Sequence, residues 1–431
     1  MAKKKIPVVK YATPTGRKLL ATIDSVRQTR DNSVSGVVTE ILSAVKTHGD
    51  KALFKFIEKF DKVKLSSKSI KVSDKELKAA AQQAPSELKE VIRETADRIR
   101  EYHKQQVRSG FSIKTNEGTL SQIITPLNRV ALYIPGGKAV YPSTVLMNAI
   151  PAQIAGVKEI VAVTPPRGEL DPGIAYALSL LGITEIYKMG GAQAIGALAY
   201  GTKTIKRVDK IVGPGNSFVA TAKRLVYGTV DIDSIAGPSE VVIIADKSVQ
   251  PSWVAYDLLA QAEHGSGDEL AICITEDESF AQAIVKATLD EIDNSPCKDR
   301  FLALPDCAIS VIVCSSREES IALSNEIGPE HLQIMTKTYK SDVKKITNAA
   351  AVFLGKYAPV ALGDYFIGTN HVLPTGGGAR FASPLGVDSF TKRISVADIT
   401  AEGLDFASPF VSTFARYENF VHHALSVEKR C

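Results

Sequence analysis

The chain has 431 residues, of which 45% are hydrophobic and 23% are charged, and its formal net charge at pH 7 is +5. This length and composition exclude a single small domain, a fibrous protein and a largely disordered chain. The 52 basic and 47 acidic residues are too evenly balanced to indicate a nucleic-acid partner. No apolar run reaches the ~18 residues of a membrane helix, and the amino terminus lacks the apolar core of a signal peptide. We expect a multi-domain cytoplasmic protein without a membrane partner.

The first elements predicted along the chain are helices. Over residues 18–107 apolar side chains recur at helical spacing, most clearly in 37–45 and 88–96. Asp50 and Asp74 are of the residue type that begins helices. The sequence therefore predicts a helical N-terminal region.

From residue 129 onward, short β-rich runs end in Gly or Pro and lead into helical stretches. Runs that begin at Glu159, Glu185 and Asp209 recur about 25 residues apart, the rhythm of strand–helix units in a parallel sheet. A second series of runs follows: Val241–Ala245, Leu270–Ile274, Ile309–Val313, Leu332–Met335 and Ala351–Leu354. Two α/β sheets are the simplest interpretation.

Two glycine-rich turns, Gly190–Gly196 and Gly213–Ser217, lie where a strand turns into a helix. Backbone N–H groups at such a turn can bind an anionic phosphate. Neither turn contains a full G-x-G-x-x-G pattern, and glycine-rich turns are also ordinary connectors in α/β folds. The pattern is compatible with an irregular Rossmann-like domain or with plain structural turns.

The cysteines and histidines differ in what they indicate. The five cysteines have no paired C-x-x-C spacing, so reduced structural thiols are expected and none has the setting of a nucleophile. Five of the seven histidines follow residue 260, namely His264, His331, His371, His422 and His423. A single histidine of this kind is more often structural than a metal ligand, so the residues around it must indicate which of the two roles it has.

The run 258–268 resembles an apolar helix that ends on a glycine but has polar groups in its last turn. At 100° per residue, Gln261 and His264 lie roughly 60° apart on one helix face, whereas Glu263 points elsewhere. Gln261 and His264 can therefore converge on one atom. The alternative is a hydrogen-bonded core glutamine and a histidine that caps the final carbonyl groups.

Two further pairs of polar residues stand out towards the carboxyl end. Glu330 and His331 are adjacent after a proline, and such a pair can supply two general bases, although an exposed loop pair has the same spacing. Asp364 and His371 lie in a glycine-punctuated loop. After Pro374 the chain is predicted to be loop-like and then helical from 407 to 427, a tail too short for its own core that should pack on another domain or subunit.

Seven motifs occur in the order found in histidinol dehydrogenases, and the chain resembles this family from about residue 35 to its end. The motifs are Leu132–Gly137, Gly190–Ile195, Ile211–Asn216, Ala236–Glu240, Leu258–Gly265, Pro329–Leu332 and Gly363–Thr375. The resemblance implies two incomplete Rossmann-like α/β domains, a helical N-terminal region and a small C-terminal helical tail exchanged across a homodimer.

The resemblance also implies domain limits. We expect an N-terminal arm at 1–25, a first α/β domain from 26–125 plus 237–380 that carries most zinc ligands, a second, NAD-binding α/β domain at 126–236, and a tail at 381–431 that completes the partner's active site.

The activity implied by the family is zinc-dependent, NAD-linked oxidation of L-histidinol through L-histidinaldehyde to L-histidine, the last two steps of histidine biosynthesis. Its zinc ligands, one ion per subunit, correspond here to Gln261, His264, Asp364 and His423. His423 is chosen over His422 because the family ligand follows a glutamate by five positions, and that glutamate corresponds to Glu418.

The family's catalytic pair corresponds to Glu330, which activates water, and His331, which takes protons in both steps. Substrate contacts by resemblance are Ser239, Gln261, His264, His331, Asp364, His371, Glu418 and His423, and NAD contacts are Tyr133, Gln193 and Asn216. Two alternatives stay open: a related dehydrogenase of another small alcohol, such as a sulfonated diol, and a non-catalytic assembly protein stabilised by metal.

Overall fold

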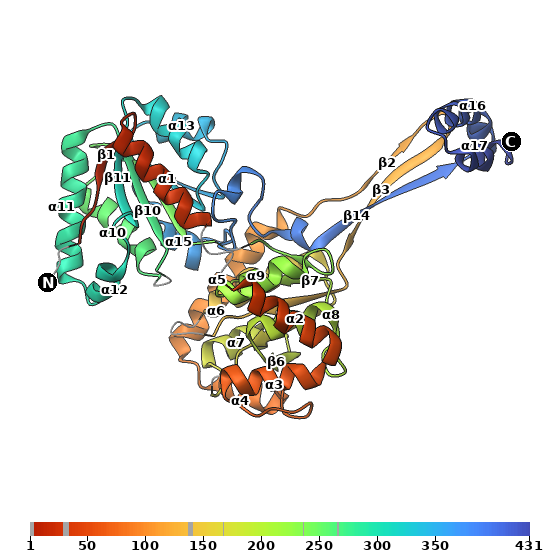
Figure 1. Ribbon diagram of the computed structural model, residues 1–431, viewed down its shortest axis with the longest axis horizontal. Coiled ribbons are helices and arrows are strands. Elements are labelled where there is room, and N and C mark those ends of the chain that lie inside the picture. Colours follow the sequence, from red (N-terminus) through yellow and green to blue (C-terminus); the bar gives the residue numbers. More distant parts are fainter. Residues whose placement is uncertain (1–3, 29–33, 137–140, 167, 236, 265–266) are drawn as a thin grey trace.

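The computed structural model describes residues 4–28, 34–136, 141–166, 168–235, 237–264 and 267–431. Three of the motif residues noted above, Gly137, Ala236 and Gly265, lie outside these ranges. The described chain forms a body with two parallel sheets, from which a slender antiparallel sheet projects (Figure 1). Mixed α/β architecture is thereby confirmed.

A six-stranded parallel sheet is built mainly from the second half of the chain. Its strand order is β1 (Val8–Lys10), β11 (Ile309–Val313), β10 (Leu270–Thr275), β9 (Glu240–Ala245), β12 (His331–Met335) and β13 (Ala351–Leu354). Alternate residues along the strands enter two separate apolar clusters, so both faces of the sheet are buried. Burial on both faces explains why these strands read as continuous apolar runs.

Helices cover both faces of this sheet. One cluster includes side chains from α10 (Pro251–Ala262), α11 (Glu278–Asn294) and α12 (Lys298–Ala303), and the other includes side chains from α1 (Pro14–Gln28), α13 (Arg317–Ile327) and α14 (Tyr339–Asp342). A short helix, α15 (Val360–Tyr365), follows β13. Because β1 pairs with β11, Val8–Lys10 near the amino terminus are part of this sheet.

A five-stranded parallel sheet forms the other half of the body. Its order is β6 (Ile186–Lys188), β5 (Glu159–Thr164), β4 (Arg129–Tyr133), β7 (Lys210–Val212) and β8 (Asp231–Ile232). The strand order reverses between β4 and β7, which makes the crevice at their carboxyl ends the topological switch point, the usual ligand position in such sheets.

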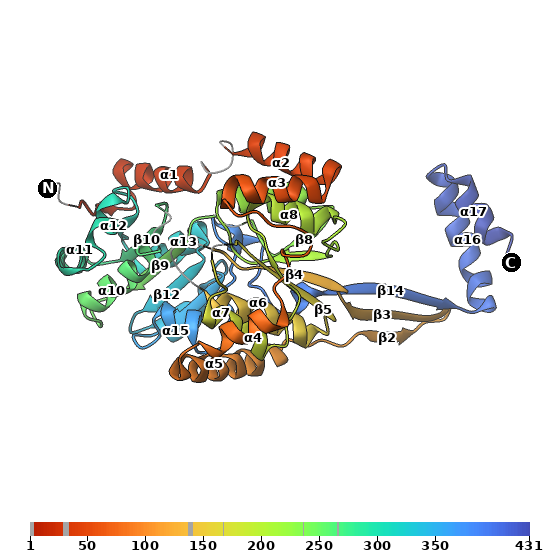
Figure 2. The same cartoon turned by 90° about the horizontal axis from the view of Figure 1, so that it is seen from below.

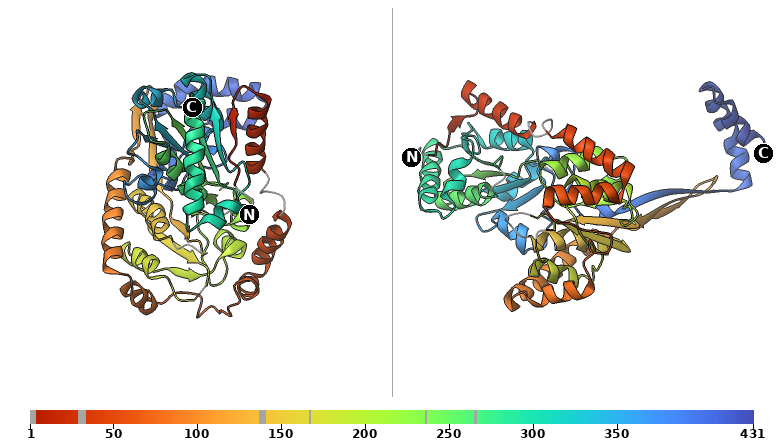
Figure 3. Two further views of the ribbon diagram at one scale, coloured as in Figure 1. Left: turned by 90° about the vertical axis from the view of Figure 1, so that its left-hand side faces the viewer. Right: turned by 60° about the horizontal axis from the view of Figure 1, so that its bottom comes forward.

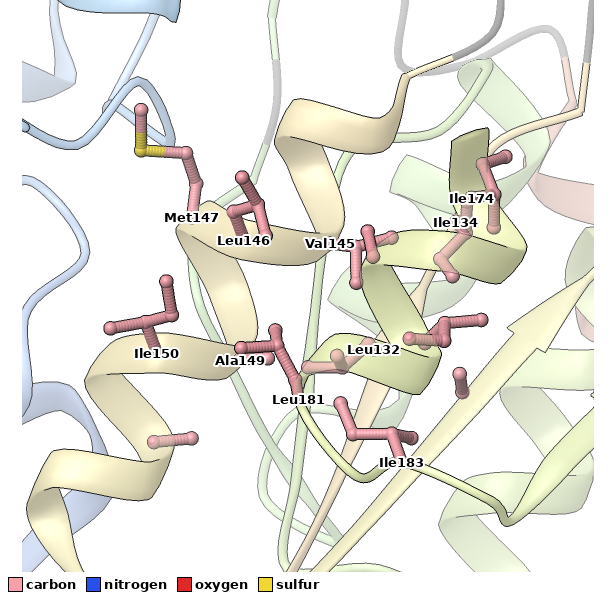
Figure 4. Packing of buried hydrophobic residues seen from close by; sticks show 14 of the residues in the cluster. Leu132, Ile134, Val145, Leu146, Met147, Ala149, Ile150, Ile174, Leu181 and Ile183 are labelled. Carbon is pink, nitrogen blue, oxygen red and sulfur yellow. The ribbon is translucent and has the colours of Figure 1, made fainter. Parts of the chain in front are cut away.

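In the part of the chain that the structure describes, eight helices pack on the five-stranded sheet. Side chains of α4 (Asp74–Gln82), α5 (Ser86–Lys104), α6 (Pro142–Ala155) and α7 (Pro172–Leu180) lie on one face, and those of α2 (Ser35–His48), α3 (Asp50–Asp61), α8 (Gly191–Tyr200) and α9 (Ser217–Val226) lie on the other. Figure 4 shows Leu132 of β4 among Val145 and Ala149 of α6 and Leu181, which follows α7. Proline at the first position of α6 and α7 fixes a φ angle that suits a helix start.

The packing of the N-terminal helices differs from the expected grouping of residues 26–125 with 237–380. Buried residues of these helices, including Val38 and Ile99, share apolar clusters with β4 of the five-stranded sheet. Helical periodicity identified a buried face on each helix, but it carries no information about which sheet that face covers.

The tail contains a strand that the sequence analysis treated as part of a loop. An antiparallel sheet consists of β14 (Thr391–Ile399), β3 (Gly118–Pro126) and β2 (Phe111–Lys114), and it carries α16 (Ala401–Tyr417) and α17 (Val421–Glu428) at its tip. The tip lies far from both parallel sheets (Figures 1 and 2), at the opposite end of the molecule from the N terminus (Figure 3). Most residues of β14 are exposed, so no buried stripe marks the strand in the sequence.

Among the residues that the structure describes, none of the helices has both the length and the apolar character needed to cross a membrane.

Candidate active site

A pocket of about 340 Å³ lies between the two parallel sheets. Pro135 and Gly213–Gly215 line it from turns at the carboxyl ends of β4 and β7, the switch point of the five-stranded sheet. Ser239, Glu330 and His331 line it from the amino ends of β9 and β12, together with His264, Asp364 and His371. Six of the predicted site residues therefore meet in one pocket.

Glu330 and His331 are both held by the main chain of Glu240. The N–H of Glu240 donates to Oε2 of Glu330 at 2.8 Å, and Nδ1 of His331 lies 3.1 Å from the Glu240 carbonyl oxygen. Gly328, at φ 58°, ends α13 in the left-handed conformation, and Pro329 then leads the chain into β12. The two side chains are therefore held in place at the start of β12. The alternative interpretation, that Glu330 and His331 are an exposed pair in a loop, is wrong.

Burial shifts the pKa values of this pair in opposite directions. Burial raises the pKa of Glu330 well above its ordinary value, and the nearby carboxyls of Glu240 and Asp364 add to the increase. A carboxylate with a raised pKa is a stronger base. Burial also lowers the pKa of His331 to about 4, so its imidazole is neutral near pH 7.

Three histidines of the pocket share one arrangement. Nδ1 of His264 lies 2.9 Å from the Gln261 carbonyl oxygen, Nδ1 of His331 faces the Glu240 carbonyl, and Nδ1 of His371 lies 3.1 Å from the Asp364 carbonyl oxygen. Because a carbonyl oxygen only accepts, Nδ1 carries the proton of each neutral ring. Each ring is left with a lone pair on Nε2, which suits a base or a metal ligand.

The end of α10 differs from the geometry expected from its sequence. The helix ends at Ala262, and His264 lies in the following turn, so Gln261 and His264 do not share a helix face. His264 contacts a carbonyl group of the last helical turn, as the capping alternative expects. Gln261 is buried, and its Nε2 has no hydrogen-bond partner within the described part of the chain. A buried amide of this kind is unusual in a purely structural role.

Asp364 lies near the end of α15, with its carboxylate in the pocket. Oδ1 of Asp364 is 3.8 Å from Nε2 of His331, and burial raises the pKa of Asp364 to about 6. Within the described ranges no three His, Cys, Asp or Glu side chains are arranged to hold a metal ion. One copy of the chain thus brings His264 and Asp364 into the pocket, whereas Gln261 is not among its lining residues and contacts His264 through its carbonyl group.

Glu418 and His423 do not reach the pocket of their own chain. Glu418 follows the end of α16 and His423 lies in α17, at the tip of the projecting sheet (Figure 1). Both are exposed, and around them lie exposed apolar side chains: Phe406, Phe410, Phe414, Tyr417, Phe420 and Val421. An apolar surface of this extent on so small a unit indicates a face that packs against something else.

The three predicted NAD contacts lie at the switch-point side of the five-stranded sheet. Tyr133 ends β4, and its hydroxyl accepts the N–H of Gly191 at 3.0 Å. Gln193 is buried in the first turn of α8, and Asn216 caps α9 by accepting the N–H of Val219. Tyr133 and Gln193 are buried and none of the three lines the pocket, so their contact with NAD stays a prediction.

The pocket also contains residues that the sequence analysis did not identify. Lys223 and Asp233, each 3% exposed, form a hydrogen-bonded ion pair, and Lys223 Nζ donates to the Gly213 carbonyl at 2.9 Å. Oδ2 of Asp233 accepts the N–H of Gly213 at 2.7 Å. The pair fixes the turn that lines the pocket. Its one sequence signal is a lysine on the buried face of α9, beside Val219 and Val226.

Two parallel sheets that face each other across a pocket with a buried carboxyl–imidazole pair define an α/β enzyme with acid–base chemistry. The family model for histidinol dehydrogenase matches residues 25–431. The chain is 42% identical over 418 residues to a histidinol dehydrogenase of Nitrosospira multiformis. The aligned region covers 96% of this chain and 94% of that protein. It is 46% identical over 396 residues to one of Geobacillus kaustophilus, covering 91% and 93%.

A solved structure agrees with these relatives. The histidinol dehydrogenase of Elizabethkingia anophelis is 36% identical to this chain and superposes with a TM-score of 0.87, covering 99% of this chain and 98% of that one. The chain belongs to the histidinol dehydrogenase family.

Proposed function

We propose that this chain oxidises L-histidinol through L-histidinaldehyde to L-histidine, with NAD as the oxidant and one zinc ion per subunit. The observation that carries the proposal is the pair of buried bases, Glu330 and His331, which the Glu240 main chain holds at the pocket beside Asp364. Family membership supplies the substrate, and the pair supplies the proton chemistry that two successive oxidations require.

His331 acts in the first oxidation. Its Nε2 has no hydrogen-bond partner among the described residues, so the lone pair of the neutral ring is available for a proton. His331 takes the substrate hydroxyl proton as hydride leaves the same carbon. The hydride acceptor would be NAD, and Tyr133, Gln193 and Asn216 would hold it.

Glu330 acts in the second oxidation. It removes a proton from the water that adds to the bound aldehyde as the aldehyde oxygen gains a proton, and His331 then takes a proton from the resulting diol as the second hydride leaves for a second NAD. Water serves here in place of a thiol. No cysteine lines the described pocket, and burial raises the pKa values of the Cys273 and Cys314 thiols, so neither is a ready nucleophile.

The donor set fits zinc. Gln261, His264 and Asp364 offer an amide oxygen, an imidazole and a carboxylate, and such N and O ligands suit a borderline divalent ion. The unpartnered Nε2 of buried Gln261 and the carbonyl-bound Nδ1 of His264 both agree with a ligand role. Zinc would supply a Lewis-acidic anchor for the substrate's imidazole and amine, with Ser239 and His371 nearby.

The fourth ligand, His423, and the substrate contact Glu418 are proposed to come from a second copy of the chain. Both lie on the projecting tip with its exposed aromatic face, and they are far from the pocket of their own chain. A homodimer in which each tip reaches the other pocket would bury this face and complete both sites.

Counting NADH per substrate tests the proposed reaction. Purified protein with zinc and excess NAD should produce two NADH for each L-histidinol consumed, with L-histidine as product. One or no NADH from histidinol, together with turnover of another small alcohol, would indicate the related dehydrogenase. Bound zinc without turnover of any alcohol would indicate the non-catalytic assembly protein.

A further inference from the structure

We propose that Arg27 and Glu240 are positioning residues that hold Glu330 and His331 in their working geometry. The kinetic consequence of this role depends on the function proposed above, whereas the structural consequence does not. Neither Arg27 nor the Glu240 carboxylate lines the pocket, so their effect passes through the two bases.

Glu240 contacts the side chains of the two bases through its main chain, while the main chain of Glu330 and of Gly376 contacts its carboxylate. As the first residue of β9, it uses its N–H for Glu330 and its carbonyl oxygen for His331. Its side chain therefore remains available to fix the main chain in place. That side chain is 2% exposed, and burial raises its pKa, against the opposing effect of Arg27.

Arg27 holds this carboxylate with both arms of its guanidinium. Nε donates to Oε1 of Glu240 at 2.7 Å and Nη2 donates to Oε2 at 3.0 Å, the bidentate geometry that is specific to arginine. The Arg27 side chain is 8% exposed, so water screens the pair only weakly. The nearby Asp24 is an outer, exposed neighbour at 3.7 Å.

The same guanidinium also holds the segment that leads into the bases. Nη1 of Arg27 donates to the Ile327 carbonyl oxygen at 3.1 Å, and Ile327 is the last residue of α13. Only Gly328 and Pro329 separate it from Glu330. Arg27 thus connects β9, whose first residue holds the two bases, with the end of α13, the helix that precedes the bases in the chain.

Loss of Arg27 would leave a buried carboxylate without its partner cation. Such a group becomes protonated or moves towards water, and both changes disturb the position of the first residue of β9. Because this residue holds both Glu330 and His331, we expect one substitution outside the pocket to loosen both bases.

Arg317 provides a matched control. It is a partly buried arginine, 18% exposed, on a helix that packs on the same face of the six-stranded sheet as α1, and it pairs with Glu276 at 2.7 Å and Asp342 at 2.9 Å. It lies at the first residue of α13, whereas Arg27 contacts the last, and none of these three residues lines the pocket. Arg317→Met should cost stability without loosening the bases.

The structural test compares the full-length proteins Arg27→Met, Arg27→Lys and Arg317→Met with the unaltered chain. Diethyl pyrocarbonate modifies accessible imidazole nitrogens, and peptide mass spectrometry reports its rate at His331. We expect several-fold faster modification of His331 in Arg27→Met, partial return in Arg27→Lys, and an unchanged rate in Arg317→Met. Equal rates at His331 in Arg27→Met and the unaltered chain, or equal increases in both methionine variants, would overturn the proposal.

The kinetic test uses the same proteins after thermal melting has confirmed that they are folded. Arg27→Met should lower kcat by about 10–100-fold, with little change in the KM for histidinol and with unchanged zinc content. A rise in KM without a fall in kcat in Arg27→Met, or an equal fall in kcat in Arg317→Met, would contradict the positioning role of Arg27. If the unaltered chain does not oxidise histidinol, the proposed function fails, and the modification rate at His331 still decides the positioning role.

Discussion

Nε2 of His331 lies 3.8 Å from Oδ1 of Asp364, so the proposed base and a proposed zinc ligand face each other across a short gap. The distance exceeds a hydrogen bond, and Nε2 has no other partner among the described residues. A substrate anchored at Asp364 would therefore present its hydroxyl group directly beside the base.

His331→Asn should slow both oxidations. Asparagine retains a polar side chain but cannot accept a proton near neutral pH, and general-base catalysis contributes roughly 10²–10⁴-fold. We expect losses in this range whether the assay starts from L-histidinol or from L-histidinaldehyde. A loss confined to one of the two substrates would remove His331 from the other step.

Glu330→Gln should separate the two oxidations. The amide can still accept the N–H of Glu240, so the geometry is preserved while the base is lost. Oxidation of the alcohol should stay within a few-fold of normal, whereas oxidation of the aldehyde should fall by roughly 10²–10⁴-fold. Rapid-quench measurement of each half-reaction checks this, and equal losses in the two would contradict the division of roles.

His423→Ala should abolish stable zinc binding, and His422→Ala should not. The two residues are adjacent in α17, so they form a matched pair for the question of which one binds the metal. Metal analysis after dialysis measures the zinc content of each protein. Full zinc in His423→Ala together with loss of zinc in His422→Ala would reverse the assignment.

Glu185→Gln should alter the acid stability of the five-stranded sheet. Hydrogen bonds from Arg129, at 2.6 and 2.8 Å, hold the pKa of Glu185 below its ordinary value of 4.5. A lowered folded-state pKa contributes stability above the unfolded-state pKa, and this contribution is lost as pH falls through the folded-state pKa.

Thermal melting across the acid range measures this effect. Near pH 7 the free energy of unfolding of the unaltered chain should be larger than that of Glu185→Gln by on the order of 2 kcal/mol. This is the contribution of a hydrogen bond to a charged group. Below the ordinary pKa of a glutamate the gap should close. A gap that stays constant from neutral to acid pH would show that the ionised carboxylate does not contribute.

The strands of the two parallel sheets were predictable from the sequence because they are buried. Runs such as Val241–Ala245 and Ile309–Val313 are apolar throughout, and both are strands in the structure. β14 was missed because its residues contact mainly β3 and water, so no apolar pattern marks it. The end of α10 at Ala262, before His264, was not predictable because periodicity does not locate the last residue of a helix.

The candidate site was predictable only in part. The local motifs located Glu330, His331 and Asp364, and the structure places them in one pocket. The contact between Arg27 and Glu240 joins residues 213 positions apart, and no local pattern can indicate such a pair. The tip that carries His423 was recognised as too small to fold alone, but its projection on an antiparallel sheet has no sequence signal.

Mixing two inactive variants tests whether a pocket of one copy and the tip of another form the working site. His331→Asn damages only the body and slows both oxidations, and His423→Ala damages only the tip, so a mixed dimer would contain one intact site. After equal mixing and subunit exchange, histidinol-dependent NADH formation should recover to about a quarter of normal. Activity that stays at the level of the separate variants, although differently tagged subunits co-purify, would contradict a site shared between copies.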